Sequence, residues 1–115
     1  MEELERNIRI NALFDKYEPL LSKTQQKMIG LYYRDDLSLG EIAELENVSR
    51  NAVYDSVKKG IILLEEYEMK LNLLEKNKEV NELIDRILDM NISIEVTNLL
   101  NKVKERVNEW WRSNR

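Results

Sequence analysis

At 115 residues, with 43% hydrophobic and 35% charged side chains, the sequence is typical of a soluble, helix-rich protein that buries a single core. Because it contains neither cysteine nor histidine, it excludes disulfide frameworks, zinc fingers and Ser-His triads, and we expect no metal, no cofactor and no enzyme activity. Its net charge of −4 is low for a strongly DNA-binding protein, and no apolar run approaches the roughly 18 residues that cross a bilayer, so we expect a cytoplasmic protein without membrane insertion.

The first predicted element is an amphipathic helix over residues 4–17. The apolar side chains between Ile10 and Tyr17 recur at helical spacing and form one stripe. Pro19 disfavours helix at the residue before it and so ends the element. The aromatic side chains of the stripe could stack on single-stranded nucleic acid, but such a stripe is core far more often, and we expect this helix to pack across the rest of the bundle.

Residues 22–34 are predicted to form the next helix, with Ser22 or Thr24 as its N-cap. Lys23 and Lys27 lie one helical turn apart on it. Such a pair could hold a phosphate, although two solvated lysines are the commoner explanation. Both lysines are therefore weak candidates for a phosphate contact. The positions expected to face inward are Met28, Leu31 and Tyr32.

The chain is organised around residues 38–60, which predict two short helices joined by a tight turn. Ser38 can cap the first helix while Glu41 returns a bond to the Ser38 amide, the reciprocal capping box. Asn47 suits the reversal because asparagine enters the left-handed region more cheaply than most residues, and Ser49 can cap the second helix. Two capped helices only a turn apart predict a helix-turn-helix motif.

The second helix of the motif has an apolar and a polar side. Val53, Val57 and Ile61 recur every four residues and predict a buried stripe. Arginine pairs with guanine, asparagine pairs with adenine and lysine attracts phosphate, so the residue types on the polar side fit major-groove reading. An ordinary solvated helix face is the alternative. The candidate DNA-binding residues are Ser49, Arg50, Asn51, Tyr54, Lys58 and Lys59.

Charge is distributed unevenly around the motif. Residues 22–34 and 49–60 are basic, whereas residues 35–48 between them are acidic, and the charges of the three segments cancel. Affinity that depends on neutralising phosphates should therefore be modest and easily lost in salt.

The second motif helix is predicted to continue beyond Gly60, because a lone glycine lowers helix propensity by only about 1 kcal/mol. Val57, Leu64 and Leu71 repeat every seven residues and, with the offset apolar residues near them, form a short seam that ends by Lys78. Such a run is too short for an isolated coiled coil, so it must pack on the chain's own helices or on a second copy. Gly60 would permit either a close approach or a bend.

Two further amphipathic helices are predicted, one from residue 80 to about Asn91 and one capped by Ser93. The last helix carries Trp110 and Trp111. An exposed pair of tryptophans is costly for a small protein, so we expect the pair to dock onto the bundle or, alternatively, to meet a partner surface.

Together these elements predict an all-α protein in two parts. Residues 1–60 form the helix-turn-helix domain. Residues 61–115 continue the long helix and add the C-terminal helices, and because this half carries no basic cluster, we interpret it as an arm for interaction or dimerisation. We expect a homodimer formed through this arm.

The run TQQKMIGLYYRDDLSLGEIAELENVSRNAVYDSVKK, residues 24–59, resembles sigma-factor region 4, in which an S-L-x-E-I-A helix precedes a V-S-R-x-A-V recognition helix. A closer resemblance covers roughly residues 7–75. The pieces NALFDKYEPLLSKTQ, SRNAVYDSVKK and LLEEYEMKL are similar to the YlxM family of small bacterial helix-turn-helix proteins. That resemblance implies a regulator whose gene commonly neighbours those of the signal recognition particle (SRP) GTPase and its receptor.

The expected function is that of a non-enzymatic regulatory protein that binds duplex DNA and takes part in the SRP pathway. The expected architecture is a sigma region 4-like helix-turn-helix bundle with a C-terminal helical arm. The alternative function is that of an adaptor that binds the SRP GTPase or SRP RNA rather than DNA.

The sigma-like resemblance also assigns sides of the motif helices. The chain departs from the usual pattern at Glu46, where an apolar residue is common, and at Asn47, where glycine is common. Leu45 could replace the lost apolar contact through a slight rotation of its helix. The positions that the resemblance expects to face the core are Ile42, Val48 and Val53.

Overall fold

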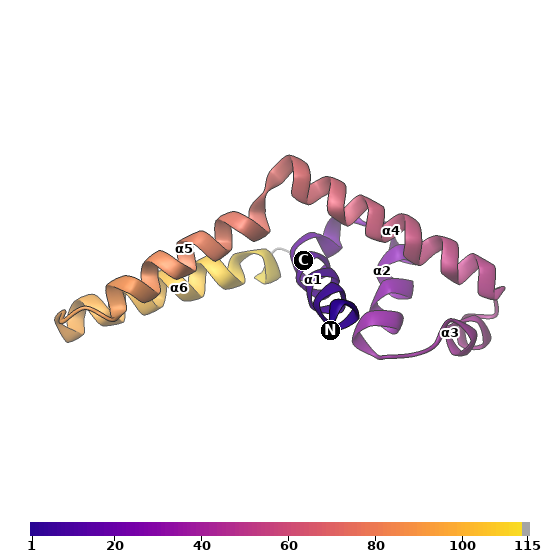
Figure 1. Ribbon diagram of the computed structural model, residues 1–115, viewed down its shortest axis with the longest axis horizontal. Coiled ribbons are helices and arrows are strands. Elements are labelled where there is room, and N and C mark those ends of the chain that lie inside the picture. Colours follow the sequence, from indigo (N-terminus) through magenta and orange to yellow (C-terminus); the bar gives the residue numbers. More distant parts are fainter. Residues whose placement is uncertain (114–115) are drawn as a thin grey trace. The chain divides into compact units, whose positions relative to one another are not determined.

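The computed structural model describes the backbone of residues 1–113 and the side chains of residues 1–109, and this part of the chain is helical, with no β-strand (Figure 1). The all-α class expected from the sequence is confirmed. No helix in the described part is both long and apolar enough to cross a membrane. The chain divides into two compact units, Met1–Leu71 and Asn72–Arg115. The elements are α1 (Glu2–Tyr17), the 3-10 turn η1 (Glu18–Leu20), α2 (Lys23–Ile29), the π-helical turn η2 (Gly30–Arg34), α3 (Leu39–Glu46), α4 (Arg50–Leu71), α5 (Leu73–Leu88) and α6 (Ile94–Ser113).

The first unit packs α1, α2 and α3 against the long helix α4. The stripe predicted on α1 is its core face, since Leu13 and Phe14 are completely buried and Tyr17 is 1% exposed. Tyr17 Oη donates a 2.5 Å hydrogen bond to Oε1 of Glu68, a buried carboxylate on α4. The aromatic side chains of α1 therefore serve the core and are not available as stacking surfaces.

Helices α2 and α4 approach each other closely at Gly60. A Cβ atom on this residue would overlap Cδ1 of Ile29 and would lie 3.7 Å from Cβ of Gln25. Ile29 is itself completely buried, and α4 runs through Gly60 without interruption. Of the two roles expected for this glycine, the structure shows the close approach.

The long helix α4 ends at Leu71, because Asn72 adopts the left-handed backbone conformation, with φ 55° and ψ 30°. The prediction of one helical seam that continues beyond Leu71 toward Lys78 is therefore wrong: Leu64 is buried, whereas Leu71 is 45% exposed. The boundary between the compact units falls at this turn, whereas the boundary expected from the sequence lies at residue 60. The difference arises because the end of α4, with buried Leu64, packs within the first unit.

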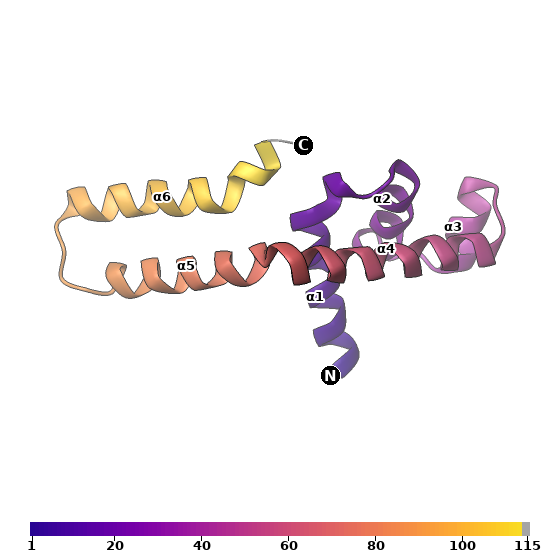
Figure 2. The same cartoon turned by 90° about the horizontal axis from the view of Figure 1, so that it is seen from above.

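The second unit is a hairpin in which α5 and α6 run antiparallel (Figure 2). Ser93 caps α6, as predicted, by accepting a 3.2 Å hydrogen bond from the Val96 amide. Across the hairpin, Oδ1 of Asn108 accepts hydrogen bonds of 3.0 Å from Asn77 and 2.8 Å from Asn81. Part of the contact between the two helices is therefore polar.

Few apolar side chains are buried inside this hairpin. Among residues 72–109, Ile84 alone is buried. The side chains of Trp110 and Trp111 lie outside the described residues, so the expected docking of this pair stays a prediction. The described part of the hairpin thus has almost no core of its own.

Candidate nucleic-acid interface

The helix-turn-helix is formed by α3 and α4, and its ends are capped as predicted. Ser38 Oγ accepts a hydrogen bond from the Glu41 amide and the Glu41 carboxylate accepts one from the Ser38 amide, both at 3.0 Å. Asn47 lies in the left-handed region, with φ 56° and ψ 48°, and Ser49 Oγ accepts a 3.0 Å hydrogen bond from the Ala52 amide. The hydrogen bonds from Ser38 lower the pKa of Glu41, which favours the charged form that completes the cap.

The inner side of the motif differs from the expectation at the end of α3. Ile42 and Val53 are completely buried, as predicted. Leu45 is 62% exposed and Val48 is 42% exposed, so the core roles predicted for these two residues are wrong. Helix α3 is therefore not rotated to bring Leu45 inward.

An ion pair accompanies this orientation of α3. Lys27 Nζ on α2 lies 2.9 Å from Oε1 of Glu46, whose side chain is only 20% exposed. A charged contact between α2 and α3 thus stands where sigma-like motifs place an apolar one. The same contact affects the weak phosphate candidates: Lys23 is exposed, but a phosphate held jointly by Lys23 and Lys27 would have to displace Glu46.

The residues predicted to contact DNA are all exposed at the start of α4. Lys58 Nζ lies 5.8 Å from the centroid of the Tyr54 ring, within range of a cation–π contact. Arg50, Tyr54 and Lys58 share one side of the helix, whereas Lys59 points about 100° away from Lys58. Ser49 uses its hydroxyl to cap the helix. The exposed residues are Ser49, Arg50, Asn51, Tyr54, Lys58 and Lys59. Of these, Arg50, Asn51, Tyr54 and Lys58 are hereafter the recognition face.

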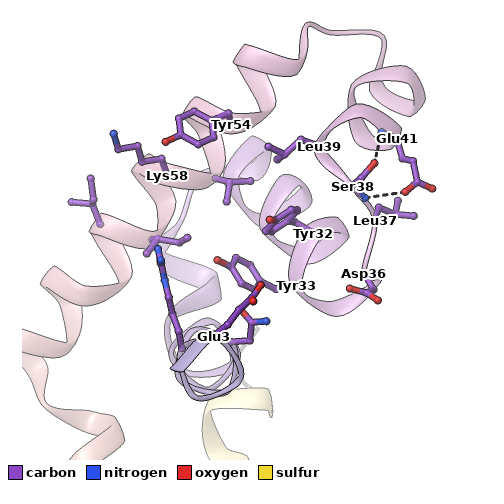
Figure 3. Close-up of a pocket in the computed structure, with 15 residues that line it drawn as sticks. Glu3, Tyr32, Tyr33, Asp36, Leu37, Ser38, Leu39, Glu41, Tyr54 and Lys58 are labelled. Carbon is purple, nitrogen blue, oxygen red and sulfur yellow. Dashed lines mark hydrogen bonds between the residues drawn. The ribbon is translucent and has the colours of Figure 1, made fainter. Parts of the chain in front are cut away.

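A groove of about 740 Å³ opens beside the recognition face, between α1, η2, α3 and α4 (Figure 3). Tyr54 and Lys58 of α4 line it, so the groove and the recognition face share these two side chains. Tyr32 and Tyr33 of η2 line another wall, and their rings meet edge to face with centroids 5.0 Å apart. Burial raises the pKa of Tyr33, so its hydroxyl stays protonated and can donate a hydrogen bond.

The groove combines apolar side chains with charged groups of both signs. Val57, Ile61 and Ile62 of α4 contribute the apolar surface, and Ile62 is 50% exposed. Glu3, Asp36 and Glu41 contribute carboxylates, and Arg6 and Lys58 contribute positive charges. Sequence patterns did not indicate this groove, because its lining residues come from four separate elements. The two consecutive tyrosines of η2 are the one local signal.

Arg34 joins the tyrosine wall of the groove to α1. Its guanidinium forms ion pairs with Asp15 and with Glu18, the latter at 3.2 Å. Its Cζ atom also lies 4.4 Å from the centroid of the Phe14 ring. These contacts hold η2 against α1 and use the charge of Arg34 within the fold.

Some basic side chains of the first unit form ion pairs within the fold, whereas others keep a charge that a ligand can use. Arg9 donates two hydrogen bonds of 2.8 Å to the Glu65 carboxylate, which joins α1 to α4. This pairing lowers the pKa of Glu65 and raises that of Arg9. In the part of the chain with described side chains, Arg50 and Lys58 form no ion pair, so their charge is available to a phosphate.

Comparison with known proteins identifies relatives of this chain. Residues 4–106 match the UPF0122 family, described as "Putative helix-turn-helix protein, YlxM / p13 like". A UPF0122 protein of Limosilactobacillus reuteri (strain DSM 20016) is 53% identical over 85 residues, which cover 74% of this chain and 75% of the relative. Those of Halalkalibacterium halodurans and Bacillus cereus (strain AH187) are 50% and 52% identical over 84 residues, covering 73% of this chain and 77% and 76% of the relatives. The resemblance to the YlxM family is confirmed.

Proposed function

Because this chain belongs to the UPF0122 family of YlxM- and p13-like helix-turn-helix proteins, we propose that it is a regulatory protein that binds duplex DNA through α4 and catalyses no reaction. One observation carries the proposal: the recognition face is exposed on the outer side of a capped motif whose inner side is core. A helix presented in this way fits the major groove of DNA.

In this proposal the first turns of α4 lie in the major groove. Arg50 donates two hydrogen bonds to a guanine and Asn51 pairs with an adenine, while Lys58 binds a phosphate. Few basic side chains contribute to phosphate binding, because the acidic residues around the motif offset the charge of its basic residues. With about two to four phosphate contacts, the logarithm of the affinity falls against the logarithm of salt with a slope of about −2 to −4.

Fluorescence anisotropy of labelled genomic duplex fragments, titrated with the full chain at low salt, tests this proposal. The double variant Arg50→Ala and Lys58→Ala should weaken binding by about tenfold or more. Lys70→Ala with Lys78→Ala removes the same charge from exposed positions outside the motif and should change binding by less than about twofold. Absence of binding at low ionic strength, or equal losses for the two double variants, would contradict the proposal.

A second candidate function uses the groove instead of the recognition face. Its lining of apolar side chains and charged groups of both signs suits a protein segment that offers apolar and charged side chains. In this version the chain is an adaptor in the SRP pathway that binds the SRP GTPase, or SRP RNA, rather than DNA. The groove supports a protein-binding role, and the link to SRP components rests on the sequence resemblance alone.

Binding of the full chain to the SRP GTPase, to SRP RNA and to duplex DNA, measured side by side, separates the two functions. Ile62→Asp places a charge in the groove and should abolish binding to the GTPase. Met69→Asp is the matched control, because Met69 lies on the same helix, is 84% exposed and does not line the groove. An adaptor role is ruled out if neither SRP component binds or if both variants lose binding equally.

A further inference from the structure

Each helix of the second unit carries two stripes at heptad spacing. One stripe faces the other helix: on α5 it includes the part-buried Asn77 and Asn81 and the buried Ile84. The second stripe is apolar and remains exposed. Its members are Val80, Leu83, Ile87 and Met90, within or just after α5, and Val96, Leu99 and Val103 on α6. These seven residues are hereafter the hairpin face.

The exposed stripes of α5 and α6 lie on the same side of the hairpin. On α5 the exposed Leu83 precedes the buried Ile84, and on α6 the exposed Leu99 precedes the largely buried Leu100. On each helix, the exposed stripe is therefore rotated by about 100° from the inner stripe around the helix axis. The rotation has the same sense on both helices when each is viewed from its own N-terminus. Because the helices run antiparallel, these equal rotations bring both stripes to one side, and the seven side chains form one continuous surface.

The size of the hairpin face matches that of an interface between two copies. Its side chains are exposed by 37% at Val80 and Ile87 and by up to 62% at Leu99. A fully buried aliphatic side chain removes about 100 Å² of apolar surface from water, so the face offers about 350 Å² per copy. Two such faces, with the polar rim that interfaces carry, would bury about 1,200 Å² in total, the size at which specific interfaces begin.

We propose that the hairpin face is covered by the same face of a second copy of this chain, so that two hairpins form a four-helix bundle. The hairpin needs such a layer because Ile84 is the one buried apolar side chain among residues 72–109. A two-fold contact uses the same patch on both copies, so one apolar surface is sufficient to build it. Two antiparallel hairpins also supply the four helices that close a bundle core.

Single cysteines test which molecule covers the face, because the chain has no cysteine of its own. Leu99→Cys places a thiol on the hairpin face, and Asn101→Cys places one on the opposite, exposed side of α6. The rate of reaction with a maleimide is measured at chain concentrations from about 2 to about 200 µM. By mass action, the free-monomer fraction falls by at most about tenfold over this range, so the thiol at position 99 should react several-fold more slowly at the highest concentration, while the thiol at position 101 should react at a constant rate.

Sedimentation of the full chain gives the second readout. The unaltered chain should be a dimer at about 100 µM and dissociate on dilution, whereas Leu83→Glu with Leu99→Glu should be monomeric. Lys78→Gln with Asn101→Glu makes the same change in charge on the other side of the hairpin and should remain dimeric. If the glutamate variant loses helicity by circular dichroism, the thiol rates decide.

Three results would overturn the proposal. A monomer at every concentration excludes a second copy. If the thiol at position 99 reacts slowly at every concentration, a segment of the same chain covers the hairpin face. A fast rate at every concentration leaves the face open for a different protein.

Discussion

Replacing Gly60 by alanine should destabilise the first unit, although alanine is the better helix former. The change gains up to about 1 kcal/mol of helix propensity. The new methyl group overlaps Cδ1 of Ile29, and because Ile29 is completely buried, its side chain has little space into which to move. Overpacking of this kind costs about 1–3 kcal/mol, so we expect a net loss of about 1 kcal/mol in the free energy of unfolding.

A double-mutant cycle tests whether this overlap is the cause. Ile29→Val removes Cδ1 and should cost about 0.5–1.5 kcal/mol alone. In the double variant the alanine methyl fills the vacated space, so urea titrations followed by circular dichroism should give a coupling of about 1–2 kcal/mol in favour of the pair. Gly40→Ala is the control and should stabilise by up to about 1 kcal/mol, because its Cβ would meet only Ser38 Oγ, at 3.9 Å. Additive effects, or equal stabilisation at both glycines, would refute the close approach.

Three further predictions concern other contacts of the first unit. Ser38→Ala removes the N-cap of α3 and should cost about 1 kcal/mol in urea titrations, and an unchanged midpoint would argue against the capping box. Tyr17→Phe deletes the hydrogen bond to buried Glu68 and should cost about 1–3 kcal/mol, seen as a lower thermal midpoint; an equal midpoint would mean that this bond adds no stability. The hydrogen bond from Arg9 lowers the pKa of Glu65, so this carboxylate stabilises the fold above the usual glutamate range, and the stabilisation is lost as pH falls through the lowered pKa. The stability difference between the chain and its Glu65→Gln variant should therefore shrink between about pH 6 and about pH 3, whereas a constant difference would contradict the pairing.

The local parts of this fold could be predicted from the sequence. The capping box of Ser38 and Glu41, the turn at Asn47 and the cap at Ser49 each depend on residues within a few positions of one another. Their geometry is set by the backbone groups that a helix end leaves without partners. The helix-turn-helix could therefore be located before any tertiary contact was known.

Contacts between distant segments could not be predicted in the same way. In the observed orientation of α3, Glu46 pairs with Lys27 of another helix and Leu45 is exposed, whereas the sequence suggested that Leu45 could turn inward. The end of α4 shows the same limit. The helix continues through Gly60, as predicted, but it ends at Leu71, before Asn72, rather than continuing toward Lys78.

One part of the candidate site could be predicted from local sequence and the other could not. The recognition face follows from one helix, and its four members are exposed as the helical period requires. The groove needs side chains from α1, η2, α3 and α4, so no single stretch of sequence indicated it. Whether DNA uses the recognition face stays a prediction that the binding experiments address.

The contacts of Arg34 have a consequence for how the groove would receive a ligand. Because Arg34 holds η2 through Asp15, Glu18 and the Phe14 ring, the tyrosine wall is in place before anything binds. An occupant would then dock as a rigid body and lose little affinity to ordering of the protein. A change at Arg34 would loosen this wall while the caps of the helix-turn-helix remain intact. A change at Arg34 thus weakens the groove while Arg50 and Asn51 of the recognition face stay in place.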